Sequence, residues 1–196
     1  MEDLVDFVNK HTHAFDESHD INHALAVYYN AVVITNTDYP DICDPDIIMY
    51  GAILHDLCDY KYGDKTINKS VLFDFISGKL SIEKANIIME VIENLSFSRE
   101  INGLRHNVQQ PYLDILSDAD KLEAISLERC ITFSRATNRK IPFDVIQHCH
   151  EKLLRLSSEF IRTKTGRAMS EPLHDNLVKD LEKLINGTYT KNRLYI

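Results

Sequence analysis

The sequence predicts an all-α protein. Apolar residues recur at helical spacing along nearly the whole chain, alternating strand patterns are nearly absent, and the 196 residues include only six glycines. A chain of this length is most simply one domain, and 44% apolar residues is an ordinary share for a protein with a packed core. We therefore expect a single helical domain over residues 1–196.

The boundaries of the expected helices follow from capping residues and breaks. Asp44 is placed to cap a helix whose first residue is Pro45, and Ser81 is placed to cap the next but one. Pro111 opens a long helix, which the segment RKIP ends, and TKTGR separates the last two helices. The expected helices cover residues 2–15, 20–36, the segment PDIIMYGAILHDLCDY, 66–77, 82–95, 112–136, 143–163 and about 168–186.

Composition excludes several classes of protein. The net charge of −8 and the pI of about 5.5 argue against general nucleic-acid binding, which needs a basic face. An anionic substrate would have to be attracted locally, by a metal ion or a few basic side chains. No apolar run approaches the roughly 18 residues of a membrane helix, so no membrane association is expected. The start of the chain lacks a signal-peptide pattern, and no CxxC pair occurs, so we expect a cytoplasmic protein with reduced cysteines. Its oligomeric state stays open.

One face of an expected helix changes from apolar to polar residues towards the end of the helix. Ile48, Ala52, His55 and Asp59 share this face, and Asp56 is adjacent to His55. Buried charge is costly unless it is paired or bound to metal. Either a His–Asp pair ends the helix, or these residues belong to a metal site.

A second apolar stripe contains an acid. Asp118 lies in phase with Ile115 and Leu122, whereas Asp120 shares a different face with Glu123, where a solvated role is more natural. Two buried acids and a histidine without matching buried bases suggest a cation between them. The phase therefore favours Asp118 over Asp120 as the ligand.

Two histidines on the second helix add a further candidate. His19 and His23 lie four residues apart in His-Asp-x-x-His, which is similar to the His-Glu-x-x-His of zinc proteases. Aspartate is one methylene shorter than the glutamate of that motif, and no third ligand follows at the required place. We therefore favour His23 as a metal ligand without a protease function.

The ordered set His23, His55-Asp56 and Asp118 resembles the H…HD…D pattern of the HD-domain superfamily of metal-dependent phosphohydrolases. Five segments resemble one bacterial-type subgroup in order: SHDINHALAVYYNA, AILHDLCDYK, VIENLSFS, SDADKLEA and HCHEKLLRL…TKTGRAMSE. The resemblance implies an HD-domain helical bundle with its core at about 16–185. It also implies that His23, His55, Asp56 and Asp118 bind one divalent metal ion. Ala26 replaces an arginine of the subgroup pattern, and Lys121 and Glu123 replace an arginine and an aspartate.

Roles for further residues follow from this resemblance and from spacing. The mixed N/O ligand set suits Mn, Fe, Co, Ni, Zn or Mg. Asp59 orients or deprotonates the attacking water, or else is a surface acid paired with Lys61. His19 is a second acid/base group or a capping residue. Lys121 is expected to contact phosphate or the leaving group. Lys61 and Lys152 match basic positions of the subgroup and are weaker substrate-binding candidates.

The predicted function is hydrolysis of a small phosphorylated substrate, with a nucleotide favoured. The subgroup resemblance favours nucleoside triphosphates cut to monophosphate and pyrophosphate. The alternatives are a nucleotidase or phosphodiesterase acting on another phosphorylated metabolite, and a catalytically idle HD module that only binds nucleotides or partners. Retention of the complete ligand pattern argues against the idle module.

Overall fold

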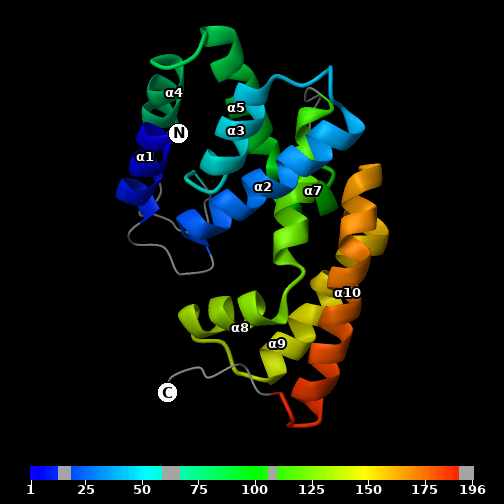
Figure 1. Cartoon of the computed structure of the whole chain (residues 1–196). Helices are drawn as coiled ribbons and strands as arrows, with labels where there is room; N and C mark the ends of the chain where they lie inside the picture. Colours follow the sequence, from blue (N-terminus) through cyan, green and yellow to red (C-terminus); the bar gives the residue numbers. More distant parts are fainter. Residues whose placement is uncertain (13–18, 59–66, 106–109, 190–196) are drawn as a thin grey trace.

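The computed structural model describes residues 1–12, 19–58, 67–105 and 110–189. Over these residues every regular element is a helix, which confirms the predicted all-α fold (Figure 1). The elements are, in chain order, α1 (Glu2–Thr12), α2 (Ile21–Asp38), α3 (Pro45–Leu54), α4 (Lys69–Ser77), α5 (Ile82–Leu95), α6 (Phe97–Ile101), α7 (Tyr112–Ala124), α8 (Leu127–Ala136), α9 (Phe143–His148), the π-helical segments η3 (Cys149–Leu153) and η4 (Leu156–Phe160), and α10 (Lys164–Ile185).

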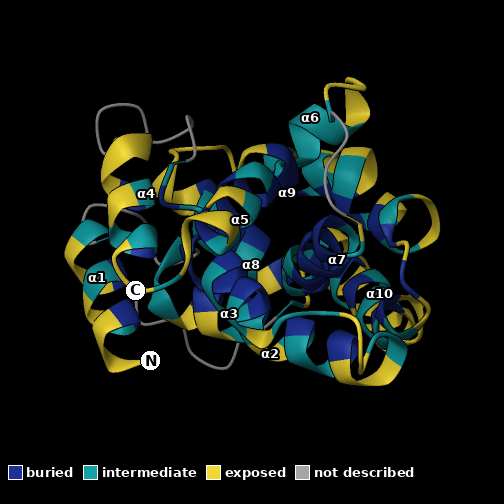
Figure 2. Ribbon diagram, turned by 90° about the horizontal axis from the view of Figure 1, so that it is seen from above, coloured by how far each residue is buried: buried dark blue, intermediate teal, exposed yellow. Residues whose placement is uncertain are grey.

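Helix α2 lies at the centre of the packing. It contacts α3 and α7 along its length, and α3 in turn packs on α5. Helices α8 and α9 lie beyond the end of α7, and the long α10 runs beside α7 and reaches α8 (Figure 1). Buried residues gather on the inward surfaces of α2, α3, α5 and α7, while α1 and α4 present exposed outer faces (Figure 2).

Two predicted helix starts are found where the capping residues placed them. The Asp44 carboxylate accepts a hydrogen bond from the Asp46 N–H at 2.9 Å, and Pro45 is the first residue of α3. The Ser81 hydroxyl accepts from the Lys84 N–H at 3.3 Å at the start of α5. In both cases a side chain satisfies an N–H group that the helix leaves without a partner.

Several predicted boundaries are wrong. The segment PDIIMYGAILHDLCDY was expected to form one helix, but α3 ends at Leu54 and residues 55–58 form turns. The expected helix over 112–136 is interrupted after Ala124, because the Ser126 hydroxyl accepts from the Arg129 N–H at 3.3 Å and caps a new helix, α8. The segment TKTGR is the first turn of α10 and not a connection. There the Thr163 hydroxyl accepts from the Gly166 N–H at 3.1 Å. Within the described ranges, no helix has both the length and the apolar character needed to cross a membrane.

Candidate active site

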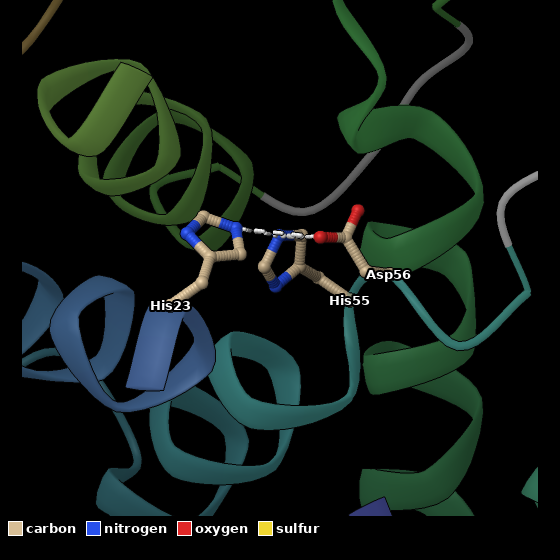
Figure 3. Close-up of side chains that lie close together, drawn as sticks. All are labelled: His23, His55 and Asp56. Carbon is tan, nitrogen blue, oxygen red and sulfur yellow. Dashed lines mark hydrogen bonds and ion pairs between the residues drawn. The ribbon is translucent and has the colours of Figure 1, made fainter. Parts of the chain in front are cut away.

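Two histidines and an aspartate converge where α2 meets the end of α3. His23 lies in the first turn of α2, and His55 and Asp56 directly follow α3. The His23 Nε2 atom lies 3.3 Å from His55 Nε2, and each of these nitrogens lies 3.3 Å from Asp56 Oδ2 (Figure 3). The three atoms therefore form a nearly equilateral triangle in a buried region.

Backbone contacts orient both histidines. The Asp20 carboxylate accepts from the N–H groups of Asn22 at 2.9 Å and His23 at 3.1 Å, which fixes the start of α2 and places His23 in its first turn. The His55 Nδ1 atom lies 2.7 Å from the Ala52 carbonyl oxygen. A carbonyl only accepts, so Nδ1 carries the proton and Nε2 faces the cluster.

The cluster holds more negative than positive charge. Burial alone favours the neutral imidazole of His55, but Asp56 and Asp120 outweigh burial and raise its pKa to about 9. Burial lowers the pKa of His23, against the opposing effect of Asp56. Carboxylates held next to buried imidazoles require a compensating positive charge, which a proton or a metal ion can supply.

The spacing of the three atoms suits a metal ion. Ligands about 2.1 Å from an ion lie about 3.0 Å apart at right angles and about 3.4 Å apart at the tetrahedral angle. The observed 3.3 Å falls within this range. In addition, Asp56 Oδ2 is buried and faces the Nε2 atoms of both imidazoles, as a carboxylate ligand of a shared ion would. His23, His55 and Asp56 therefore fit a divalent ion.

The third element of the cluster is α7, and here the prediction of Asp118 is corrected. Asp120 Oδ1 lies 3.5 Å from His23 Nε2 and 3.7 Å from His55 Nε2. Asp118 is fully buried elsewhere: its carboxylate accepts from the Arg162 N–H at 2.9 Å and the Thr163 N–H at 2.7 Å. Residues two positions apart on a helix point about 200° apart, so only one of the two can face the histidines.

Lys121 does not contact the cleft either, which corrects its predicted role at the substrate. Its Nζ atom lies 2.8 Å from Glu100 Oε2 and donates to the Ser117 hydroxyl at 2.7 Å and the Phe160 carbonyl at 2.9 Å. The side chain is only 4% exposed. Lys121 follows Asp118 by three residues and shares its face of α7, so the same error of phase affected both residues.

A cavity of about 680 Å³ opens over the cluster. His55, Asp56 and Asp120 form one part of its lining. Side chains of α5, α6, α8, α9 and η3 form most of the rest. Its basic residues are Lys69, Arg99, Arg129, Arg139 and Lys152. This cavity gives an acidic protein the local positive charge that an anionic ligand needs.

The family model for the HD domain matches residues 20–125, more than half of the chain. The chain belongs to the HD-domain family. This confirms the resemblance inferred from the motifs. The matched segment contains all four residues that converge in the structure. No curated protein matches the chain significantly.

Solved structures share the arrangement of this HD domain along nearly its whole length. The crystal structure of Bacillus subtilis YpgQ in complex with ADP has a TM-score of 0.77 and 22% identity, covering 95% of this chain and 93% of that one. A protein from Lactobacillus plantarum has a TM-score of 0.75 and 16% identity, with 94% of each chain covered. At these identities the comparisons establish a common fold.

The remaining predicted residues divide into two groups. His19 and Lys152 line the cavity of the HD domain. The His19 ring centroid lies 5.7 Å from that of His23, and Lys152 Nζ lies 4.7 Å from the centre of the Phe97 ring. Asp59 and Lys61 lie outside the described residues, so their roles stay predictions.

Sequence reasoning missed a carboxylate that links the metal ligands to the cavity. Glu123 Oε2 lies 2.8 Å from Arg129 Nη1 and 4.0 Å from His23 Nδ1, which is buried without a hydrogen-bond partner. The signal was present in the sequence, because Asp120 and Glu123 share a helix face. We interpreted that face as solvated, whereas it lies against the HD histidines.

Proposed function

We propose that this HD domain is a metal-dependent phosphohydrolase that acts on a nucleotide. The observation that carries the proposal is the convergence of His23, His55, Asp56 and Asp120 beneath a cavity with five basic residues. The first three would bind the metal through their clustered atoms, and Asp120 would complete the set. A bound divalent ion lowers the pKa of water and offsets the charge of a phosphoryl group.

The chain's own residues prepare this chemistry. The Ala52 carbonyl holds the protonated Nδ1 of His55, so that Nε2 is directed at the ion site. Asp56 and Asp120 supply negative charge from two different elements. His19 lies one ring contact from His23 on the cavity wall, within reach of a proton transfer to or from bound substrate.

The nucleotide is supported by the cavity and by a structural relative. The cavity combines basic side chains with an apolar surface from Met89, Ile92, Leu95 and Phe97, as a charged ligand with an apolar ring system would require. YpgQ, which shares the fold, is described in complex with ADP. We further propose that the substrate is a nucleoside triphosphate and that attack at the α-phosphorus gives monophosphate and pyrophosphate.

The test is a panel of nucleoside tri-, di- and monophosphates assayed with Mn²⁺, Co²⁺, Mg²⁺ and Zn²⁺, with products separated by anion exchange. We expect pyrophosphate from triphosphates with at least one of these ions. The Asp56→Ala variant should lose both bound metal and turnover. Asp175→Ala, which removes an exposed acid of α10, is the matched control and should retain both.

Three results would distinguish the bond that is cleaved, catalysis itself and the metal centre. Orthophosphate from monophosphates, with triphosphates intact, would remove the pyrophosphohydrolase assignment and keep the metal site. Metal binding by wild type without turnover of any nucleotide would favour the idle binding module. Equal metal content in Asp56→Ala and wild type would reject the metal centre itself.

A further inference from the structure

We propose that Arg139, His148 and Lys152 form a binding site for the phosphoryl groups of the substrate that are not attacked. This inference rests on the proposed function and specifies its substrate class: a compound with a polyphosphate arm. All three side chains line the wall of the cavity formed by the end of α8, the loop after it, α9 and η3. They come from a different part of the chain than the proposed metal ligands.

Three further basic residues of the cavity have partners that the structure describes. Lys69 pairs with Glu93 at 2.9 Å, and Arg129 pairs with Glu123 at 2.8 Å. The Arg99 guanidinium donates to the Leu104 carbonyl at 3.2 Å. Two of these cations are therefore neutralised by a neighbouring carboxylate.

Arg139 makes no ion pair with any residue that the structure describes. Its guanidinium carbon lies 5.0 Å from the centre of the Phe133 ring. Its backbone N–H donates to the Ser134 carbonyl at 2.8 Å. The preceding residue, Asn138, has a φ of 54°, a left-handed conformation that asparagine adopts more readily than most residues. This turn sets Arg139 against the cavity with its charged group available to a ligand.

His148 lines the same cavity as Arg139 and Lys152. Burial, and then the charges of Lys152 and Arg139, lower the pKa of His148 to about 4. The imidazole is therefore neutral at pH 7 and offers an N–H donor in the same cavity as the two cations. Such a combination suits the spread charge of a diphosphate group, which accepts several charge-assisted hydrogen bonds at once.

This site is connected to the proposed metal centre by ring contacts. The His19 ring lies 5.7 Å from His23 on one side and 5.7 Å from Phe133 on the other, and Arg139 lies over Phe133. The apolar side chains of Met89, Ile92 and Leu95 belong to α5, a different element of the cavity lining. A phosphoryl group at the metal would thus have the polyphosphate arm towards α8 and η3, and the nucleoside towards α5.

The experiment compares Arg139→Gln with Arg135→Gln, which removes the same charge from an exposed position near the end of α8, outside the cavity. Isothermal titration calorimetry measures binding of α,β-methylene-ATP, pyrophosphate and AMP to the Mn²⁺-loaded protein at fixed ionic strength. We expect Arg139→Gln to weaken the binding of the triphosphate analogue and of pyrophosphate about tenfold, and the binding of AMP less than about twofold. Lys152→Gln should show the same selectivity.

An equal loss for AMP and the triphosphate analogue in Arg139→Gln would overturn the proposal. The same loss in Arg135→Gln, or unchanged affinities in Arg139→Gln, would also overturn it. Thermal unfolding of each variant shows whether the fold is intact, and Arg139 is exposed, so the substitution removes no core contact. Because the measurement is binding, it decides on this site even if the hydrolysis assay fails.

Discussion

Asp118 and Asp120 are the same residue type two positions apart on one helix, yet their carboxylates have different partners. Asp118 is hydrogen-bonded by the backbone N–H groups of Arg162 and Thr163, whereas Asp120 faces His23 and His55. The apolar stripe of α7 did not distinguish them. Helix α7 is buried on several sides, so a buried position identifies the interior without identifying which neighbour it faces.

Substitutions at these two positions should separate metal binding from stability. Asp120→Asn should weaken metal binding at least tenfold and change the melting temperature of the metal-free protein little, since its side chain is partly exposed. Asp118→Asn should still bind metal, with a much smaller loss of affinity than Asp120→Asn, and lower the free energy of unfolding by about 1–3 kcal/mol, because its backbone partners lose a charged acceptor. Calorimetric titration with Mn²⁺ and urea unfolding measure the two effects. The reverse pattern would restore Asp118 as the ligand.

At the scale of elements, α6 is fixed to its neighbours by one buried carboxylate. Glu100 is 4% exposed and lies 2.8 Å from Lys121 of α7, 3.0 Å from Arg105 and 2.7 Å from Arg162, which precedes α10. Phe97 and Arg99 of the same short helix line the cavity. The network therefore holds one wall of the cavity, and this is the structural role that Lys121 has in place of substrate binding.

Glu100 should make stability depend on pH in the acid range. Burial favours its protonated form, but Lys121 and Arg162 outweigh burial and hold the pKa of Glu100 below its usual 4.5. The folded state thus binds this proton less readily than the unfolded state. The stabilisation is complete above pH 4.5 and is lost as pH falls through the folded-state pKa.

The test is the Glu100→Gln variant. It should lower the free energy of unfolding at pH 7 by about 3–5 kcal/mol, since three cations lose their buried partner. The difference from wild type should shrink as the pH is lowered below 4.5. Urea unfolding between pH 3.5 and 7 measures both. Glu83→Gln, on the exposed start of α5, is the control, and a constant difference across this range would contradict the assignment.

The sequence predicted elements best where a local side chain sets a boundary. Asp44 with Pro45, and Ser81, each specify a helix start within a few residues, so no tertiary information is needed. Ser126 and Thr163 provide the same kind of cap, but apolar spacing continues across them and suggested longer or later helices. The break after Ala124, where Ser126 caps α8, is therefore not reported by periodicity alone.

At the scale of the whole molecule, the metal ion should stabilise the fold. Its proposed ligands come from α2, the end of α3 and α7, which pack against one another at the centre of the protein. A ligand that binds only the folded state at 100 times its dissociation constant adds about 2.7 kcal/mol. For a chain of 196 residues, this corresponds to a rise in melting temperature of about 5–10 °C.

Differential scanning fluorimetry with increasing Mn²⁺ measures this rise. The Asp56→Ala variant should show no dependence on the ion, since it lacks one of the converging atoms. Asp175→Ala should behave like wild type. A similar rise in Asp56→Ala would mean that the ion binds elsewhere.

For the site as a whole, the sequence predicted which kinds of residue take part, but only part of their arrangement. His23, His55 and Asp56 are brought together as the motifs suggested, because the capped start of α2 and the end of α3 place them. Arg139 and His148 escaped prediction because Arg139 lies in a loop and His148 ends the short helix α9, and neither position is marked by a simple sequence period.

The two carboxylates of α7 have a mechanical consequence. Asp118 accepts hydrogen bonds from the two residues directly before α10. Asp120 faces the histidines on the opposite side of α7. Helix α7 cannot turn about its axis in either direction without lengthening one of these two sets of contacts. The rotation of α7 about its own axis is therefore fixed in the metal-free protein. The Asp120 carboxylate is already in position and needs little reorganisation when an ion binds. Because linked equilibria are reciprocal, a change that loosens the start of α10 should also weaken the affinity of the site for the metal ion, although no residue at the start of α10 is a proposed ligand.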